Sequence, residues 1–278
     1  MQNLTINGQR LWASLMEMAA IGATPKGGNR RLALSDEDRQ ARDLFQRWCR
    51  EAGLQVSIDR MGNMFARRAG RNDKLPPIMA GSHLDTQPTG GRFDGPLGVL
   101  AALELVRTLN DQRIETEAPI EIVNWANEEG ARFAPPMLAS AVFAGAISLE
   151  DGLARSDTDG KRYGDELDRI GYAGLAAMGG RPVGAFFELH IEQGPILERE
   201  KKTIGVVTMM QAVRYYDVTV TGEDGHAGAT PMAVRQDALL AAAKLAVEAN
   251  RIALSQPPNG RATVGYLQPQ PNVRGVVP

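Results

Sequence analysis

Amphipathic segments alternate with short apolar runs over most of the chain. Apolar residues recur at helical spacing over residues 9–21 and again after Ser35, a helix-capping residue type that precedes three acidic residues. Compact or alternating apolar runs predict strands at residues 56–58, 63–67, 78–80, 120–126 and 183–189. Because strands alternate with helices, the pattern predicts an α/β fold with a layered sheet.

The pattern changes in the last quarter of the chain. Residues 215–221 and 262–267 alternate like half-exposed strands, and residues 234–252 between them have helical spacing. This order favours a smaller α+β unit that follows the main sheet. We therefore expect a larger domain over residues 1–211 and a smaller one over residues 212–278.

Composition narrows the class of protein. The 278 residues carry a formal net charge of −2, and no dense basic cluster indicates a nucleic acid or an anionic membrane as partner. No apolar run approaches the roughly 20 residues of a membrane helix, and the N-terminus lacks a signal-peptide pattern. Cys49 is the single cysteine, which excludes an internal disulfide. We expect a cytoplasmic protein.

Polar side chains gather where the apolar run at residues 78–80 ends. His83 and Asp85 follow this predicted strand, and Asp94 follows a loop rich in glycine and proline, directly before a helical pattern. An imidazole and two carboxylates beside a helix N-terminus suit a divalent cation. Each residue alone would also fit a surface turn, but the combination favours half of a metal site.

Two later predicted strands are also followed by residue types that can bind a metal ion. One leads into Glu128 and Glu129, and the other leads into His190. Because α/β sheets carry their chemistry beyond the carboxyl ends of their strands, we expect these groups to join the first cluster in a site for one or two divalent ions. A lone histidine or a lone pair of glutamates would instead be typical of a hydrogen-bonded or solvated turn.

The residue types suggest roles within such a site. Asp94 suits a bridge between two ions, and Asp85 suits a hydrogen bond that fixes the ring of His83. Glu128 and Glu129 are neighbours that point in different directions, so one would bind metal. The other would take a proton from water and pass it to a leaving nitrogen, and spacing alone does not say which.

A tight loop presents the third histidine. His226 stands in a Gly-His-Ala-Gly stretch that is followed by Thr230 and Pro231. The ring could donate a hydrogen bond to a developing oxyanion, or it could have no functional role. The residues themselves leave both alternatives open.

Four segments together are specific for a family. They read GSHLDTQPTGGRFDGPLGV, NEEGARF, FFELHIEQGPILE and GHAGATPM. In this order they resemble the signature segments of the N-carbamoyl-L-amino-acid amidohydrolase family, which includes allantoate amidohydrolases and yeast-type β-ureidopropionases. The resemblance covers essentially the whole chain. It implies hydrolysis of the carbamoyl C–N bond of N-carbamoyl-L-amino acids or allantoate, with release of ammonia and carbon dioxide.

The resemblance also implies a site with two divalent ions, most often zinc and in other members manganese, cobalt or nickel. His83 and His190 would bind one ion, Asp94 would bridge the two ions, and Glu129 would bind the second. Glu128 would act as the general base.

Further roles follow from the same resemblance. Asp85 would orient His83, and Gln193 would contact the substrate. His226 would act as an oxyanion donor that reaches from a ferredoxin-like dimerisation domain into the site of a partner subunit. The resemblance therefore implies a homodimer.

Family chains continue past the position of Pro278, with a last histidine ligand for the second ion and an arginine for the substrate carboxylate. We therefore expect both domains to be incomplete at the C-terminus and the second ion to be held weakly. The segment PNVRGVVP resembles a family segment in which a substrate-contacting asparagine takes the place of Gly275. The alternatives to an active amidohydrolase are a truncated, inactive metal-binding member, or a dimetal hydrolase of the aminoacylase or exopeptidase type.

Overall fold

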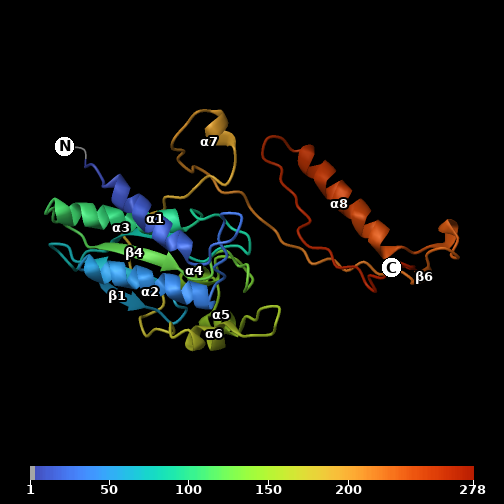
Figure 1. Ribbon diagram of the computed structural model, residues 1–278, viewed down its shortest axis with the longest axis horizontal. Helices are drawn as coiled ribbons and strands as arrows, with labels where there is room; N and C mark the ends of the chain where they lie inside the picture. Colours follow the sequence, from blue (N-terminus) through green and yellow to red (C-terminus); the bar gives the residue numbers. More distant parts are fainter. Residues whose placement is uncertain (1–3) are drawn as a thin grey trace. The chain divides into compact units, whose positions relative to one another are not determined.

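The computed structural model describes residues 4–278 and separates the chain into two compact units, Met1–Gly205 and Val206–Pro278 (Figure 1). The first unit contains a five-stranded sheet in the order β1-β2-β4-β3-β5. The strands are β1 Gln55–Ile58, β2 Met64–Arg68, β3 Ile78–His83, β4 Ile120–Trp125 and β5 Ala185–Phe187. These strands confirm the five apolar runs as strand-forming segments of an α/β unit.

Strand direction determines where the chemistry of the first unit lies. β2 is antiparallel to both β1 and β4, whereas β3 runs parallel to β4 on one side and to β5 on the other. The carboxyl ends of β3, β4 and β5 therefore lie at the same edge of the sheet. The chain segments that follow these three strands are consequently neighbours in space.

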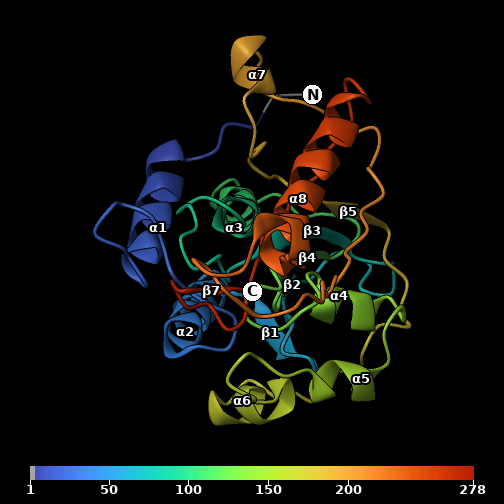
Figure 2. The ribbon, with the colours of Figure 1, turned by 90° about the vertical axis from the view of Figure 1, so that its right-hand side faces the viewer.

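Helices cover this sheet (Figure 2). α3 packs on β3 and β4, α1 packs on α3, and α2 contacts β1. The helices of the first unit are α1 Gly8–Ala20, α2 Asp36–Glu51, α3 Pro96–Asp111, α4 Leu138–Phe143, α5 Leu149–Ala154, α6 Tyr163–Arg169 and α7 Ile196–Arg199. The predicted start of α2 is confirmed, because the Ser35 side chain accepts a hydrogen bond from the backbone N–H of Asp38.

The apolar faces of these helices and the sheet form one main core. Buried side chains from α1, α2, α3 and β4 meet there, including Leu15, Phe45, Leu103 and Ile122. Within the described residues, no helix combines the length and the apolar character needed to cross a membrane.

Cys49 lies in this core and should resist thiol reagents. Burial raises the pKa of its thiol to about 12, so the reactive thiolate is scarce at pH 8 and the sulfur is also sterically shielded. We expect at least a ~100-fold slower reaction with a disulfide reagent in the folded chain than in urea, measured by the release of coloured thiolate. Equal rates in the two states would contradict the buried position.

The second unit has less regular structure than its sequence pattern predicts. It contains α8 Ala238–Leu254, the short helix η1 Met232–Val234, and a two-residue pairing of β6 Gly225–His226 with β7 Val276–Val277. The helix prediction is confirmed, but residues 215–221 and 262–267 are not strands in the structure. Their alternating side chains are mostly exposed and no neighbouring strand pairs with them, so the pattern lacks the hydrogen-bonded partner that a strand requires.

Candidate metal centre

The edge where the parallel strands end brings three predicted ligands together. His83 is the last residue of β3, Asp94 immediately precedes the first turn of α3, and His190 follows β5. One potential ligand atom from each lies within 4.8 Å of the others. His83 is buried, whereas His190 is partly exposed, so the cluster lies between the core and the surface.

Main-chain carbonyls fix the orientation of both histidine rings. Nδ1 of His83 lies 2.8 Å from the carbonyl oxygen of Asp85, and Nδ1 of His190 lies 2.8 Å from that of Ile191. A carbonyl oxygen can only accept, so each Nδ1 must carry a proton, and in the neutral ring Nε2 keeps a free lone pair. These Nε2 atoms face carboxylates, Glu128 at 3.4 Å and Asp94 at 3.3 Å. Both rings therefore present a ligand atom to the same cluster of acidic groups.

A glycine allows the loop to approach His83 this closely. Gly95 has φ of 82°, and a Cβ atom there would lie 2.4–2.6 Å from three atoms of the His83 ring. We expect Gly95→Ala to strain the backbone and displace the ring, at about 1–3 kcal/mol of unfolding free energy and with weaker Zn²⁺ binding. Urea unfolding and metal titration would measure the two effects. Gly91→Ala is a matched control, because its Cβ would meet nothing within 4 Å.

Asp85 connects the end of β3 to the segment after β4. Its Oδ1 accepts the backbone N–H of Glu128 at 3.1 Å, and its Oδ2 accepts that of Glu129 at 3.2 Å. Oδ1 also lies 3.8 Å from Nδ1 of His83, while the ring itself bonds to the Asp85 carbonyl. In the structure this carboxylate thus positions the two glutamates directly, in addition to its electrostatic effect on His83.

Burial and mutual charge shift the ionisation of this cluster. Burial raises the pKa of Asp85 to about 6. Burial also raises the pKa of Glu128, and the nearby carboxylates of Asp85 and Glu129 reinforce the shift against the opposing effect of His83. For His83, burial disfavours protonation, but the carboxylates of Asp85 and Glu128 outweigh it and raise its pKa.

The donor set fits a divalent cation. Two buried carboxylate oxygens, Asp94 Oδ1 and Glu129 Oε1, have no hydrogen-bond partner in the described structure. Buried anionic oxygens without partners are costly unless a cation compensates them. With two imidazole Nε2 atoms nearby, the set combines nitrogen and oxygen ligands that zinc and similar ions accept. With Glu129 as a further oxygen ligand, the set offers enough donor atoms to favour a second ion beside the first.

Neighbouring side chains hold the acidic ligands in place. Gln193, the predicted substrate contact, donates from Nε2 to Asp94 Oδ2 at 2.7 Å, so in the structure it contacts the centre itself. Gln87 donates to Glu129 Oε2 at 2.8 Å, and Ser82 donates to Glu188 at 2.6 Å. The sequence patterns did not single out Gln87 or Glu188. The available signal was their place in the signature segments: Gln87 lies in GSHLDTQPTGGRFDGPLGV, and Glu188 lies in FFELHIEQGPILE.

His226 belongs to the second unit and has the opposite hydrogen-bonding pattern. Its Nδ1 accepts backbone N–H groups of Gly228 at 3.1 Å and Ala229 at 3.0 Å. Because Nδ1 is the acceptor, the neutral ring carries its proton on Nε2, where it can donate. This chemistry is compatible with a donor to an anionic oxygen.

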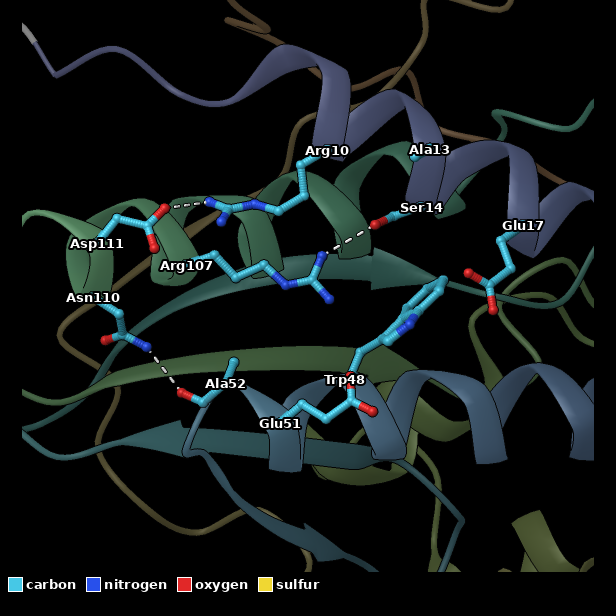
Figure 3. A pocket seen from close by; sticks show the side chains of 10 residues that line it. All are labelled: Arg10, Ala13, Ser14, Glu17, Trp48, Glu51, Ala52, Arg107, Asn110 and Asp111. Atoms are coloured by element: carbon cyan, nitrogen blue, oxygen red, sulfur yellow. Dashed lines mark hydrogen bonds and ion pairs between the residues drawn. The ribbon is translucent and has the colours of Figure 1, made fainter.

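A separate cavity of about 440 Å³ between α1, α2 and α3 contains none of these groups (Figure 3). Both arginines of its lining have partners there: Arg10 pairs with Asp111 at 2.8 Å, and Arg107 donates to Ser14 at 3.0 Å. Arg107 also lies 5.7 Å from the ring centre of Trp48. The cavity is therefore a polar junction between helices.

Comparison with known proteins agrees with this geometry. The model of peptidase family M20/M25/M40 matches residues 79–277, which contain every predicted ligand. The chain belongs to this family. It is 52% identical over 277 residues to an N-carbamoyl-L-amino-acid amidohydrolase of Rhizobium meliloti, and 40% identical over 284 residues to one of Geobacillus stearothermophilus. These matches cover 100% and 98% of this chain and 67% of each relative.

Solved structures of similar proteins also belong to amidases of the carbamoylase type. An amidase of the hydantoinase/carbamoylase family from Burkholderia vietnamiensis has a TM-score of 0.91 and 55% identity, over 100% of this chain and 67% of the other. The amidase of the same family from Burkholderia multivorans has a TM-score of 0.80 and 56% identity, over 99% of this chain and 67% of the other. This chain therefore shares sequence and fold with amidases of the hydantoinase/carbamoylase family.

Proposed function

We propose that this M20 chain is a metal-dependent amidohydrolase that cleaves the carbamoyl C–N bond of N-carbamoyl-L-amino acids or of a ureido compound such as allantoate. The observation that carries the proposal is the convergence of His83, Asp94 and His190 beside a glutamate whose pKa is raised. The four signature segments and the names of the relatives support the choice of a carbamoyl substrate over a peptide.

Each ligand has a proposed place in a site for two divalent ions, with zinc favoured and manganese, cobalt or nickel as alternatives. His83 and His190 would hold one ion, Asp94 would contribute a carboxylate to both, and Glu129 would help to hold the second. Such ions, when bound, act as Lewis acids that polarise a carbonyl oxygen and lower the pKa of water. Asp85 keeps the two glutamates in position through their backbone N–H groups.

Glu128 is the proposed general base. Its carboxylate takes a proton from water as the water oxygen bonds to the carbamoyl carbon, and it returns this proton to the amino-acid nitrogen as the C–N bond breaks. The products are the free amino acid and carbamic acid, which decomposes to ammonia and carbon dioxide. The raised pKa of Glu128 suits both steps, because the group must first accept a proton and then release it.

The remaining contacts belong to the same proposal. Gln193 reaches the substrate from its position beside Asp94. His226 donates from Nε2 to the developing oxyanion. In the proposed homodimer this histidine comes from the smaller domain, residues 212–278, of the partner subunit. The larger domain over residues 1–211 carries the metal ligands, and the protein works in the cytoplasm.

Ammonia release tests the proposed function. The purified chain with Zn²⁺ or Mn²⁺ should release ammonia from N-carbamoyl-L-amino acids or from allantoate, whereas Glu128→Gln should not. The absence of release above this control would overturn the proposal for this chain and leave a metal-binding M20 member without turnover. Cleavage of a dipeptide or an N-acetyl amino acid, with no action on carbamoyl substrates, would instead support the exopeptidase or aminoacylase alternative.

A further inference from the structure

A buried arginine lies beneath the end of β3. Arg31 belongs to the segment between α1 and α2, and it has no measurable solvent exposure. Among the described residues, no carboxylate is within 4.0 Å of its guanidinium, so it is not held by a direct ion pair. Burial lowers the pKa of Arg31 to about 10, which still leaves the group cationic at neutral pH. A buried cation of this kind requires a structural or functional reason.

The contacts of Arg31 converge on the segment that follows His83. Its Nε donates to the carbonyl oxygen of Leu84 at 2.6 Å, and its backbone N–H donates to Thr86 Oγ1 at 2.8 Å. Its own carbonyl oxygen accepts the backbone N–H of Thr86 at 2.8 Å. Three hydrogen bonds therefore join Arg31 to residues 84–86.

The other end of the guanidinium is fixed to α1. Nη1 of Arg31 donates to the carbonyl oxygens of Met18 at 3.2 Å and Ile21 at 2.8 Å. The planar guanidinium thus bonds at once to the end of α1 and to Leu84. A lysine could not reproduce this arrangement, because its ammonium is a single point of donation on a flexible stem.

Leu84 lies between two groups of the candidate centre. His83 precedes it, and Asp85 follows it with the carbonyl that accepts Nδ1–H of His83. The direction of the His83 ring and the place of the Asp85 carboxylate therefore depend on the conformation of the peptide that Arg31 holds. Outer partners of metal ligands commonly change metal affinity about 10–100-fold.

We propose that Arg31 is a positioning residue that holds residues 84–86 so that His83 Nε2 and the Asp85 carboxylate are placed for a divalent cation before the cation binds. The inference rests on the proposed function, since it assigns Arg31 a role toward the same metal centre. Arg31 contacts neither the cation nor the substrate and acts through Leu84 and Thr86.

The test compares Arg31→Lys with Arg42→Lys. Arg42 is a matched control, because it is equally buried and also cationic, but it bonds to Asp38 and to the carbonyl of Gly62. Zn²⁺ affinity is measured by competition with a chromophoric chelator, and urea unfolding of the metal-free chain gives the stability of each variant. We expect Arg31→Lys to weaken Zn²⁺ binding at least ~10-fold, and Arg42→Lys to change it less than ~2-fold at a comparable loss of stability.

The outcomes separate the two proposals. If the wild-type chain binds no Zn²⁺, the proposed function fails and this inference fails with it. If the wild-type chain binds Zn²⁺ and the two lysine variants lose affinity equally or not at all, only the role of Arg31 is overturned. Should Arg31→Lys not fold, Thr86→Val removes one of the three hydrogen bonds and leaves the cation in place. This variant should weaken Zn²⁺ binding about 3-fold, and unchanged affinity would overturn the inference.

Discussion

Replacing Glu128 with glutamine is expected to lower kcat on a carbamoyl substrate by about 10²–10⁴-fold, the usual contribution of a general base. The amide cannot accept the proton of water, but it has nearly the same shape and can keep the same backbone contacts. Asp85 would still accept the N–H of residue 128. Zn²⁺ affinity should therefore stay within a few-fold of the wild type. Initial rates of ammonia release, together with a metal titration, would measure both quantities.

Glu129→Gln is the matched control for this prediction. It changes the adjacent carboxylate, whose Oε1 is buried without a partner, and it should weaken metal binding more than Glu128→Gln does. If Glu129→Gln instead removed turnover while metal binding was kept, the two roles would have to be exchanged.

The pH dependence of the wild type checks the same assignment. Burial raises the pKa of Glu128, and a base must be deprotonated to act, so kcat/KM should fall as the pH drops through this raised pKa. The acidic limb should therefore lie above the range of an ordinary exposed glutamate. An acidic limb at about pH 4, the ordinary range for a glutamate, would contradict the role of Glu128 as the base.

Replacing His190 with alanine is expected to remove tight metal binding. Its Nε2 lies 3.3 Å from Asp94 Oδ1, and its loss leaves His83 as the single imidazole of the cluster. The fall in Zn²⁺ affinity should exceed the roughly 10–100-fold effect of losing an outer partner. Zn²⁺ at 100 times its Kd should stabilise the wild type by about 2.7 kcal/mol, and this gain should disappear in His190→Ala. Thermal or urea unfolding with and without Zn²⁺ measures the difference.

His226→Ala serves as the control for metal binding. It also removes an imidazole, but from a different unit and from a residue without a proposed ligand role. Its Zn²⁺ affinity should match that of the wild type. Equal losses in both variants would show that histidine removal acts through folding and would contradict a specific site at His190.

The sequence predicts those strands, helices and site residues whose positions depend on the local pattern of apolar and polar residues. Apolar runs identify strands, and His83 and His190 follow such runs directly, so their meeting at one sheet edge follows from parallel strand order. The alternation of apolar and polar residues at 215–221 did not predict the structure correctly. A strand also needs a neighbouring strand to pair with, and the local pattern does not show whether one is present.

Two features around the centre could not be predicted from the sequence, and the reason is physical. Asp85 acts through the backbone N–H groups of Glu128 and Glu129, which are 43 and 44 positions away in the chain. Arg31 lies in a polar segment that is typical of an exposed loop, yet the structure buries it completely. Long-range hydrogen bonds and the burial of a charged side chain have no periodic signature, so only the folded arrangement reveals them.

The main-chain partners of the three imidazoles make this chain suited to nitrogen NMR. The sequence has three histidines, His83, His190 and His226. Nδ1 of each of the first two faces one carbonyl oxygen, whereas Nδ1 of the third accepts two backbone N–H groups. A spectrum of the neutral rings should therefore contain two tautomers in a two-to-one ratio. The minority signal would identify His226 without any mutant, and the majority pair should be the signals that move when Zn²⁺ is added.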